Sequence, residues 1–284
     1  MLAPNRTPAD PHRTPGPPFP EDVRVTEDST PKLDTSVPQT ARIWNYLLGG
    51  KDNFEVDRAV GDQIVASLPH FATHARLSRQ YLVRAVRYLA GEAGVTQFLD
   101  IGTGLPTADN THEVAQATNP YAKIVYVDND PLVLAHARAL LTSTPEGKTA
   151  YIDADLRDPE RILAQAAETL DLDQPVALML MGILGHIESD DEAKKIIGSI
   201  LARFPSGSYF AMYDGSDTDP EVREATRIWN ISANPKYHLR TPERMASLFE
   251  GLELVEPGVV SVTRWRPETD APEISQFCGV GRKP

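Results

Sequence analysis

The chain has 284 residues, a formal net charge of −12 and one cysteine, Cys278. The acidic balance argues against a general nucleic-acid binder, because neutralising phosphates requires a surplus of Lys and Arg. One cysteine excludes an intrachain disulfide and a multi-cysteine zinc site. No run approaches the ~20 apolar residues of a membrane span. Without an apolar signal segment at the N-terminus, we expect a cytoplasmic protein with no membrane partner.

The composition changes near residue 38. Nine of the 24 prolines fall within the first 38 residues, where little apolar surface can offset the entropy cost of ordering. Residues 1–37 are therefore expected to form a disordered, Pro-rich tail. Apolar residues at helical spacing then predict helices over 42–48, 55–68 and 72–90. This indicates an N-terminal helical cap over 38–95, followed by the main domain over 96–284.

From residue 96 onward, short apolar segments alternate with helical ones. Strands are expected over 98–101, 122–127, 150–152, 176–181 and 208–213, and two late β segments, 252–264 and 274–281, suggest an antiparallel hairpin at the sheet edge. This alternation predicts βαβ crossovers and an α/β fold with a doubly wound, mostly parallel sheet. Ligands of such sheets bind beyond the carboxyl ends of the strands. The residues that follow each strand are therefore the candidates for a site.

An acid and two glycines close the first predicted strand, at Asp100, Gly102 and Gly104. Glycine permits a positive φ and a close approach of the backbone to a ligand. Nicotinamide sites use G-x-G-x-x-G beside a pyrophosphate, but here the third glycine is missing and Pro106 stands in the loop. A carboxylate repels a pyrophosphate and attracts the ammonium end of S-adenosylmethionine. The pattern therefore favours S-adenosylmethionine over NAD.

The next two strands also end in acids. Asp128 follows the second strand and suits the two vicinal hydroxyls of a ribose. Asp155 follows the third strand and can accept a hydrogen bond from an exocyclic adenine amine, while Leu156 packs on the ring. Capping of the next helix is the alternative role for Asp128, and it is the favoured role for Asp130. Acids in register at three strand ends strengthen the prediction of a nucleoside cofactor.

The fourth and fifth strand ends supply candidate catalytic groups, His186 and Asp214, with Tyr213 as a weaker candidate. A sulfonium methyl group is already activated, so the protein mainly has to align the reactants and exclude water. A base is needed only where the acceptor must lose a proton, as a hydroxyl or ammonium must. The other histidines lack metal-ligand spacing, and no metal site is expected.

Several long strings resemble one known family. Residues 42–54 (RIWNYLLGGKDNF), 97–107 (QFLDIGTGLPT), 125–131 (VYVDNDP) and 279–284 (GVGRKP) are similar to the S-adenosyl methyltransferase family that was long catalogued as a domain of unknown function. The similarity covers about 38–284. That family is similar to class I methyltransferases, whose Rossmann-like sheet has seven strands with the last one antiparallel. The resemblance therefore implies this fold and an S-adenosylmethionine-dependent methyltransferase.

The resemblance also implies roles for individual residues. The methionine end of the cofactor would lie against Asp100, Gly102, Thr103 and Gly104. Its ribose and adenine would lie against Asp128, Asn129, Asp155 and Leu156. The N-terminal helical cap would cover it with Asn45, Gly49 and Gly50. Two departures lie on the expected substrate side. The family commonly has Leu-His-aromatic after the fourth strand, where this chain has LGHI over 184–187, and Ser-His after the fifth, where it has Tyr213-Asp214. Either the acceptor differs or these positions are not catalytic throughout the family.

The favoured function is a methyltransferase that acts on an unidentified small-molecule acceptor by in-line transfer. The alternatives are a non-catalytic sensor or partner-binding module that binds the same cofactor and, less favoured, an NAD-dependent oxidoreductase. One pocket shared by residues 182–187, 213–215 and the cap would favour the enzyme, and a solid wall there the binding module. The sequence leaves open which acceptor is used, a protein or tRNA included, and which of its atoms is methylated. It also leaves open the need for a base, the oligomeric state and the role of the N-terminal tail.

Overall fold

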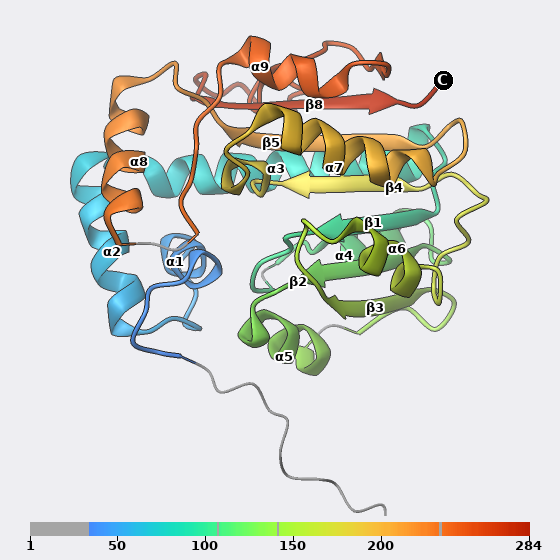
Figure 1. Cartoon of the computed structure of the whole chain (residues 1–284), viewed down its shortest axis with the longest axis horizontal. Coiled ribbons are helices and arrows are strands. Elements are labelled where there is room, and N and C mark those ends of the chain that lie inside the picture. Colours follow the sequence, from blue (N-terminus) through green and yellow to red (C-terminus); the bar gives the residue numbers. More distant parts are fainter. Residues whose placement is uncertain (1–33, 107, 141, 233–234) are drawn as a thin grey trace, which may run out of the picture. The chain divides into compact units, whose positions relative to one another are not determined.

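A computed structural model of the chain describes residues 34–106, 108–140, 142–232 and 235–284. Most of the predicted tail, residues 1–33, lies outside the described residues. Within the described part, β-strands form one mixed sheet with helices on both of its faces (Figure 1). Through these ranges no helix is both long and apolar enough to cross a membrane.

Parallel strands make up most of the sheet. The strand order is β3-β2-β1-β4-β5-β8-β6, with β7 also paired to β8. The order reverses between β1 and β4, and ligands of doubly wound sheets bind at such a switch point. The strands are β1 (Gln97–Ile101), β2 (Lys123–Asp128), β3 (Lys148–Asp153), β4 (Ala177–Met181), β5 (Tyr209–Gly215), β6 (Glu253–Leu254), β7 (Val260–Ser261) and β8 (Gln276–Arg282).

The last strand, β8, runs antiparallel to β5, which confirms the predicted antiparallel last strand. Its other side pairs with both β6 and β7, so these two segments share the outermost of seven positions across the sheet. The predicted hairpin is therefore placed differently: its second strand lies inside the sheet, and its first is reduced to two short pieces at the edge. A short, interrupted edge exposes few unpaired backbone groups.

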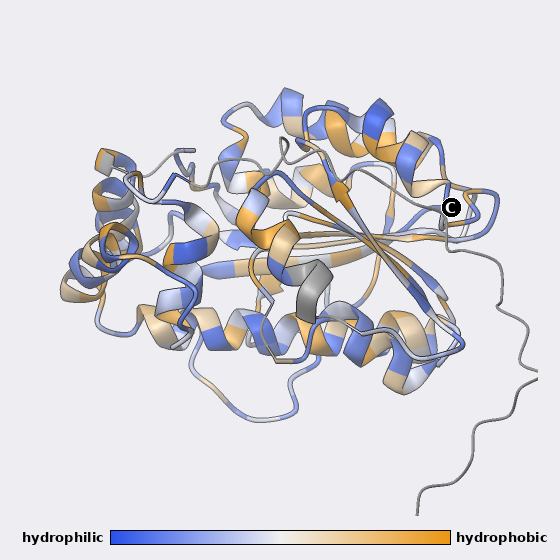
Figure 2. Ribbon diagram, turned by 90° about the horizontal axis from the view of Figure 1, so that it is seen from below, coloured by the Kyte–Doolittle hydropathy of each residue, from blue (hydrophilic) through white to orange (hydrophobic). Residues whose placement is uncertain are grey.

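Alternation along the strands sends side chains into two apolar clusters, one on each face. Leu99 and Leu178 meet α6, α7 and α9 on one face, whereas Phe98 and Met179 meet α3 and α4 on the other. Figure 2 shows apolar and polar residues alternating around these flanking helices. The helices and helical turns that follow β1 are α4 (Thr111–Thr118), α5 (Pro131–Leu140), α6 (Pro159–Ala166), η2 (Leu184–His186), α7 (Asp190–Ala202), α8 (Pro220–Ser232), α9 (Pro242–Ala246) and η3 (Ser247–Phe249).

The N-terminal helices divide between two places. α3 (Phe71–Arg87) packs on the sheet and continues into a π-helical turn, η1 (Tyr88–Glu92). α1 (Thr40–Leu47) and α2 (Glu55–Ser67) instead pack with α8 in a third apolar cluster, beyond the carboxyl ends of the parallel strands (Figure 1). We call α1, α2 and α8 together the cap. The observed cap thus draws one helix from the C-terminal half of the chain.

A buried ion pair fixes the first two helices of the cap. Asp57, in the first turn of α2, accepts hydrogen bonds from the backbone N–H groups of Gln39 (2.9 Å) and Phe54 (2.8 Å). Its carboxylate also lies 2.9 Å from Nε of Arg42, and the two side chains are 0% and 1% exposed. One carboxylate therefore joins the start of α1 to the start of α2.

We expect Asp57→Ala to lower the free energy of unfolding by about 3–5 kcal/mol, because it leaves the buried Arg42 guanidinium without its charge partner. Urea unfolding followed by tryptophan fluorescence measures the change. Glu55→Ala, an exposed position in the same helical turn, is the matched control and should cost less than about 1 kcal/mol. Equal losses for the two variants would show that the ion pair does not hold the cap.

Candidate functional site

The turn after β1 depends on two glycines. Gly102 and Gly104 have φ values of +75° and +65°, a region that residues with a side chain rarely adopt. At Gly102 a Cβ atom would also lie 2.6 Å from the side chain of Ile183. The loops that follow β1 and β4 can approach this closely only because position 102 has no side chain.

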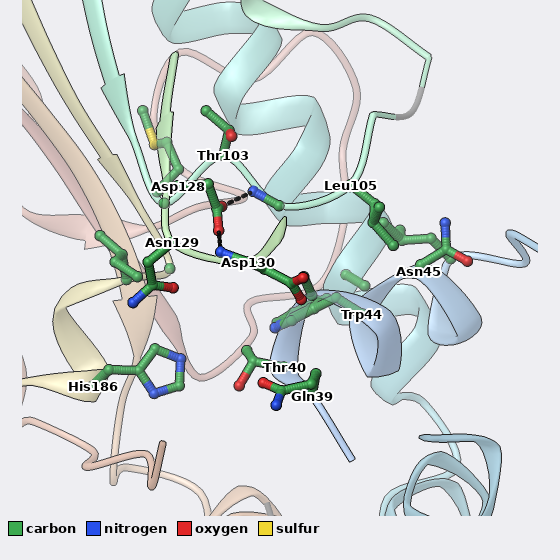
Figure 3. A pocket seen from close by; sticks show the side chains of 18 of the residues that line it. Gln39, Thr40, Trp44, Asn45, Thr103, Leu105, Asp128, Asn129, Asp130 and His186 are labelled. Atoms are coloured by element: carbon green, nitrogen blue, oxygen red, sulfur yellow. Dashed lines mark hydrogen bonds between the residues drawn. The ribbon is translucent and has the colours of Figure 1, made fainter. Parts of the chain in front are cut away.

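Asp128, at the end of β2, joins this turn to the start of α5. Its Oδ2 accepts a hydrogen bond from the N–H of Gly104 and its Oδ1 from the N–H of Asp130, both at 2.9 Å (Figure 3). Burial raises the pKa of Asp128 to about 6, and these backbone donors oppose the rise. A carboxylate offers about four acceptor sites. Asp128 therefore keeps the capacity to accept hydrogen bonds from a ligand.

Three adjoining hollows share Gly102 as a lining residue. The central cavity lies between the strand ends and α1, and its empty space, counted with the open solvent at its mouth, is about 980 Å³. Figure 3 shows Asn129 and His186 on one side of it and Thr40 and Trp44 on the other. Recesses around Asp100 and Asp155 measure about 470 Å³ and 450 Å³. We call these two hollows the Asp100 recess and the Asp155 recess.

The Asp100 recess carries groups of both charges. Asp100 is buried and accepts a hydrogen bond from Oγ1 of Thr111 at 2.6 Å. Burial raises its pKa to about 6, and the bond from Thr111 opposes the rise. Arg79 of α3 lines the same recess and donates to the carbonyl oxygens of Ala108 (3.2 Å) and Asp109 (3.0 Å). A carboxylate and a guanidinium together suit the zwitterionic end of an amino acid.

The Asp155 recess is apolar at its floor and polar at its rim. Leu156 is buried, whereas Asn129 and Asp155 are exposed and approach each other, with Nδ2 and Oδ2 3.4 Å apart. Ile183 and His186 complete the wall. A buried aliphatic surface beside an amide and a carboxylate suits a flat purine ring with an exocyclic amine.

The two candidate bases are placed differently. His186 lines the central cavity, and its Nδ1 donates to the carbonyl oxygen of Lys236 at 2.8 Å, which leaves Nε2 unprotonated in the neutral ring. Burial lowers the pKa of His186 and so favours that neutral form. Asp214 lines none of the three hollows. It accepts hydrogen bonds from the N–H of Gly185 (3.2 Å) and from the hydroxyl of Tyr237.

The two departures from the family pattern are connected through Tyr237. A Cβ atom at Gly185 would overlap the Tyr237 ring. The hydroxyl of Tyr237 donates to Asp214 and accepts a hydrogen bond from the N–H of Gly215 at 3.0 Å. The side chain of Tyr237 therefore explains both Gly185 and Asp214.

Most of the residues predicted to bind the cofactor line these hollows: Asn45, Asp100, Gly102, Thr103, Gly104, Asp128, Asn129, Asp155 and Leu156. Gly49 and Gly50 do not. Gly49, with φ +84°, follows the end of α1, and a Cβ at Gly50 would overlap the side chain of Asn45. Sequence reasoning missed Trp44 and Arg79, because helical periodicity does not show which face of a helix meets the strand ends.

Unpaired polar atoms test whether S-adenosylmethionine fits. Thr40 and Asp130 line the central cavity, and Oγ1 and Oδ2 of these residues are buried without a hydrogen-bond partner among the described residues. Buried polar atoms are nearly always paired, so these two suit a ligand that brings hydroxyl groups. The residues present therefore fit the cofactor: Asp100 would hold its amino-acid end, Asp128 its ribose and Asp155 its adenine.

The fold is that of class I methyltransferases. Magnesium protoporphyrin IX methyltransferase from Synechocystis PCC 6803, solved with bound S-adenosylhomocysteine, is 11% identical and superposes with a TM-score of 0.52. The match covers 85% of this chain and 93% of that one. At this identity the likeness shows the fold alone, and it confirms the predicted architecture.

The chain belongs to the S-adenosyl methyltransferase family, whose sequence profile matches residues 26–284. A DUF574 family protein from Streptomyces avermitilis MA-4680 is 44% identical, with a TM-score of 0.85 over 88% of this chain and 99% of that one. A protein from Thermobifida fusca YX described as a methyltransferase is also 44% identical, with a TM-score of 0.82 over 89% and 97%. No curated protein matches the sequence.

The protein is therefore an S-adenosylmethionine-dependent methyltransferase. The predicted family, activity and cofactor are confirmed, and family membership decides against the NAD-dependent alternative. Among the described residues, no group of three or more His, Cys, Asp or Glu side chains could hold a metal ion.

We expect Asp128→Asn to weaken binding of S-adenosylhomocysteine by about 10- to 100-fold, because hydrogen bonds to a charged acceptor are worth about 1.5–3 kcal/mol. Titration calorimetry measures the affinity. Asp153→Asn is the matched control: Asp153 is the exposed register partner of Asp128 on β3, and its variant should bind within about twofold of wild type. Unchanged affinity in a folded Asp128→Asn variant would refute the ribose assignment.

The affinity for S-adenosylhomocysteine should also fall as the pH drops below about 6. Burial raises the pKa of both Asp100 and Asp128 to about 6, and protonation below that value removes the negative charge that the ligand's donors meet. For each carboxyl that must lose its proton before the ligand binds, the affinity falls by about tenfold per pH unit below the pKa of that carboxyl. Above about pH 7 the affinity should be constant. The dependence should be shallower for Asp128→Asn. A flat profile down to pH 5 in the wild type would contradict this electrostatic account.

Proposed function

We propose that the protein methylates a small-molecule acceptor held between the strand ends and α1 of the cap. One observation carries the proposal: Gly182, Ile183 and Tyr213, which lie after β4 or within the end of β5, line the same cavity as Trp44 and Asn45 of α1. One shared cavity is the arrangement expected of an enzyme, whereas a binding module would have a wall there. The net charge of −12 further disfavours a nucleic-acid acceptor.

When bound, S-adenosylmethionine supplies a methyl group whose bond to sulfur breaks, leaving the electron pair on sulfur, as a lone pair of the acceptor bonds to the carbon. The chain's part is to hold the reactants in line and exclude water, and positioning of this kind can contribute about 7–11 kcal/mol. Trp44, Met181 and Ile183 give the cavity apolar walls. Asp100 and Asp128 fix the polar ends of the donor.

We assign the role of base to His186 for acceptors that carry a proton. The carbonyl oxygen of Lys236 holds the Nδ1–H, so Nε2 has the lone pair that can take a proton from a hydroxyl or ammonium. Asp214 is a positioning residue in this proposal, because its two oxygens are bonded to Gly185 and Tyr237. Burial raises the pKa of Tyr213, which keeps its hydroxyl neutral and able to donate a hydrogen bond to the acceptor.

Transfer of a radiolabelled methyl group to a metabolite extract tests the proposal. We expect label in the small-molecule fraction, and label confined to protein or nucleic acid would overturn it. His186→Asn keeps a donor for the carbonyl of Lys236, and it should slow transfer by about 10²–10⁴-fold while binding of S-adenosylhomocysteine stays within about twofold. If affinity falls as much as the rate, His186 contacts the adenine and is not the base.

A further inference from the structure

A second cavity lies within the cap. Its wall includes Trp44, Ile64, Phe71, His74, Ala225 and Trp229. These residues come from α1, α2, α3 and α8. We call this hollow the cap cavity.

The wall of the cap cavity is largely apolar and aromatic. Ile64 and Trp229 belong to the buried cluster that holds the cap together, and Trp44 and Phe71 pack against it with ring centroids 5.6 Å apart. Protein interiors are normally packed as densely as organic crystals. A hollow among buried rings lacks contacts that an apolar ligand can supply. In the described lining there is no Asp, Glu, Lys or Arg side chain, so the cavity suits an uncharged body.

Two nitrogen atoms of this wall lack a hydrogen-bond partner among the described residues. They are Nε1 of Trp229 and Nδ1 of His74, on side chains that belong to residues 5% and 7% exposed. The indole N–H is a donor only, so its complement is an acceptor atom on the ligand. Leaving a buried donor unpaired is costly. The ligand that completes this wall therefore carries an oxygen or nitrogen acceptor on an apolar body.

The cap cavity lies on the side of the switch point opposite the expected adenosine. Trp44 lines both cavities. Gly215, at the end of β5, and Gln276, at the start of β8, border the cap cavity. Asp128, at the end of β2, and Asp155, just after β3, lie on the other side of the switch point. The β5 and β8 side, where the cap cavity lies, is therefore left open to an acceptor when the donor occupies the β2 and β3 side.

We infer that the cap cavity binds the body of the methyl acceptor, and that this acceptor is a flat, uncharged aromatic molecule with a hydrogen-bond acceptor atom. That the bound molecule is the methyl acceptor rests on the proposed function. That the cavity binds a molecule of this kind does not. Ala225 and Trp229, both on α8, are then specificity-determining residues. The cap serves in this way as the acceptor site as well as a cover for the donor.

Binding of 7-hydroxycoumarin to the full chain saturated with S-adenosylhomocysteine tests the inference, with the probe's own fluorescence as the signal. Ala225→Leu fills the cavity from α8 and should weaken binding at least about tenfold. Trp229→Phe keeps an aromatic ring but removes the indole donor, and should weaken binding about 3- to 10-fold. Glu224→Ala, exposed on the same helix, is the control and should leave binding unchanged. Glutamate, a charged metabolite, should not compete with the probe.

Affinity for S-adenosylhomocysteine, measured on the same samples, separates this inference from the proposed function. Loss of the probe with retained cofactor affinity supports the cap cavity. Absence of probe binding to the wild type, or wild-type binding by Ala225→Leu, overturns it and leaves methyl transfer standing. Thr226→Leu, a half-buried position in the same wall, takes the place of Ala225→Leu if that variant does not fold. If the variants weaken probe binding as expected but no small molecule receives label, the cap cavity is supported and the proposed function is overturned.

Discussion

The carboxylate of Asp128 holds together the two loops on which the site depends. It lies at the end of β2 and accepts the N–H of Gly104 from the turn after β1 and the N–H of Asp130 from the start of α5. Its burial is unfavourable for the charged form, and the backbone donors offset only part of that cost. Because the same carboxylate retains acceptor capacity, the residue that shapes the turn is also the residue that a ribose would meet.

A second carboxylate sets the opposite wall. Asp57 binds the N–H of Gln39 and the guanidinium of Arg42, and so fixes the start of α1 against α2. That orientation puts Trp44 and Asn45 against the strand ends. The orientation of α1 against α2 therefore depends on a buried ion pair as well as on the apolar cluster of the cap, and breaking such a pair leaves an uncompensated charge in the interior. Stability of the cap and shape of the central cavity are thus linked.

The sequence predicted best the parts of the site that lie at strand ends. Asp100 and Asp128 lie at the ends of β1 and β2, and Asp155 comes just after β3. Parallel strands bring their carboxyl ends to one edge of the sheet. Strand alternation also explains why Asp214 is different: Tyr213 faces the central cavity, so its neighbour on the strand points to the other face of the sheet. Arg79 lies on a helix, and its contact with the loop after β1 depends on long-range packing that periodicity cannot predict. The same holds for α8, whose place in the cap no local pattern indicates.

Gly185, after β4, and Asp214, at the end of β5, are best explained together, by their contacts with Tyr237. Tyr237 occupies the space that Gly185 leaves, bonds to Asp214 and lines the cap cavity. A residue with a side chain at position 185 would displace the Tyr237 ring, and without Asp214 the buried Tyr237 hydroxyl would lose its acceptor. The three residues therefore depend on one another. His186 lines the central cavity and Tyr237 lines the cap cavity, so a substitution at position 185 or 214 would change the cap cavity through Tyr237.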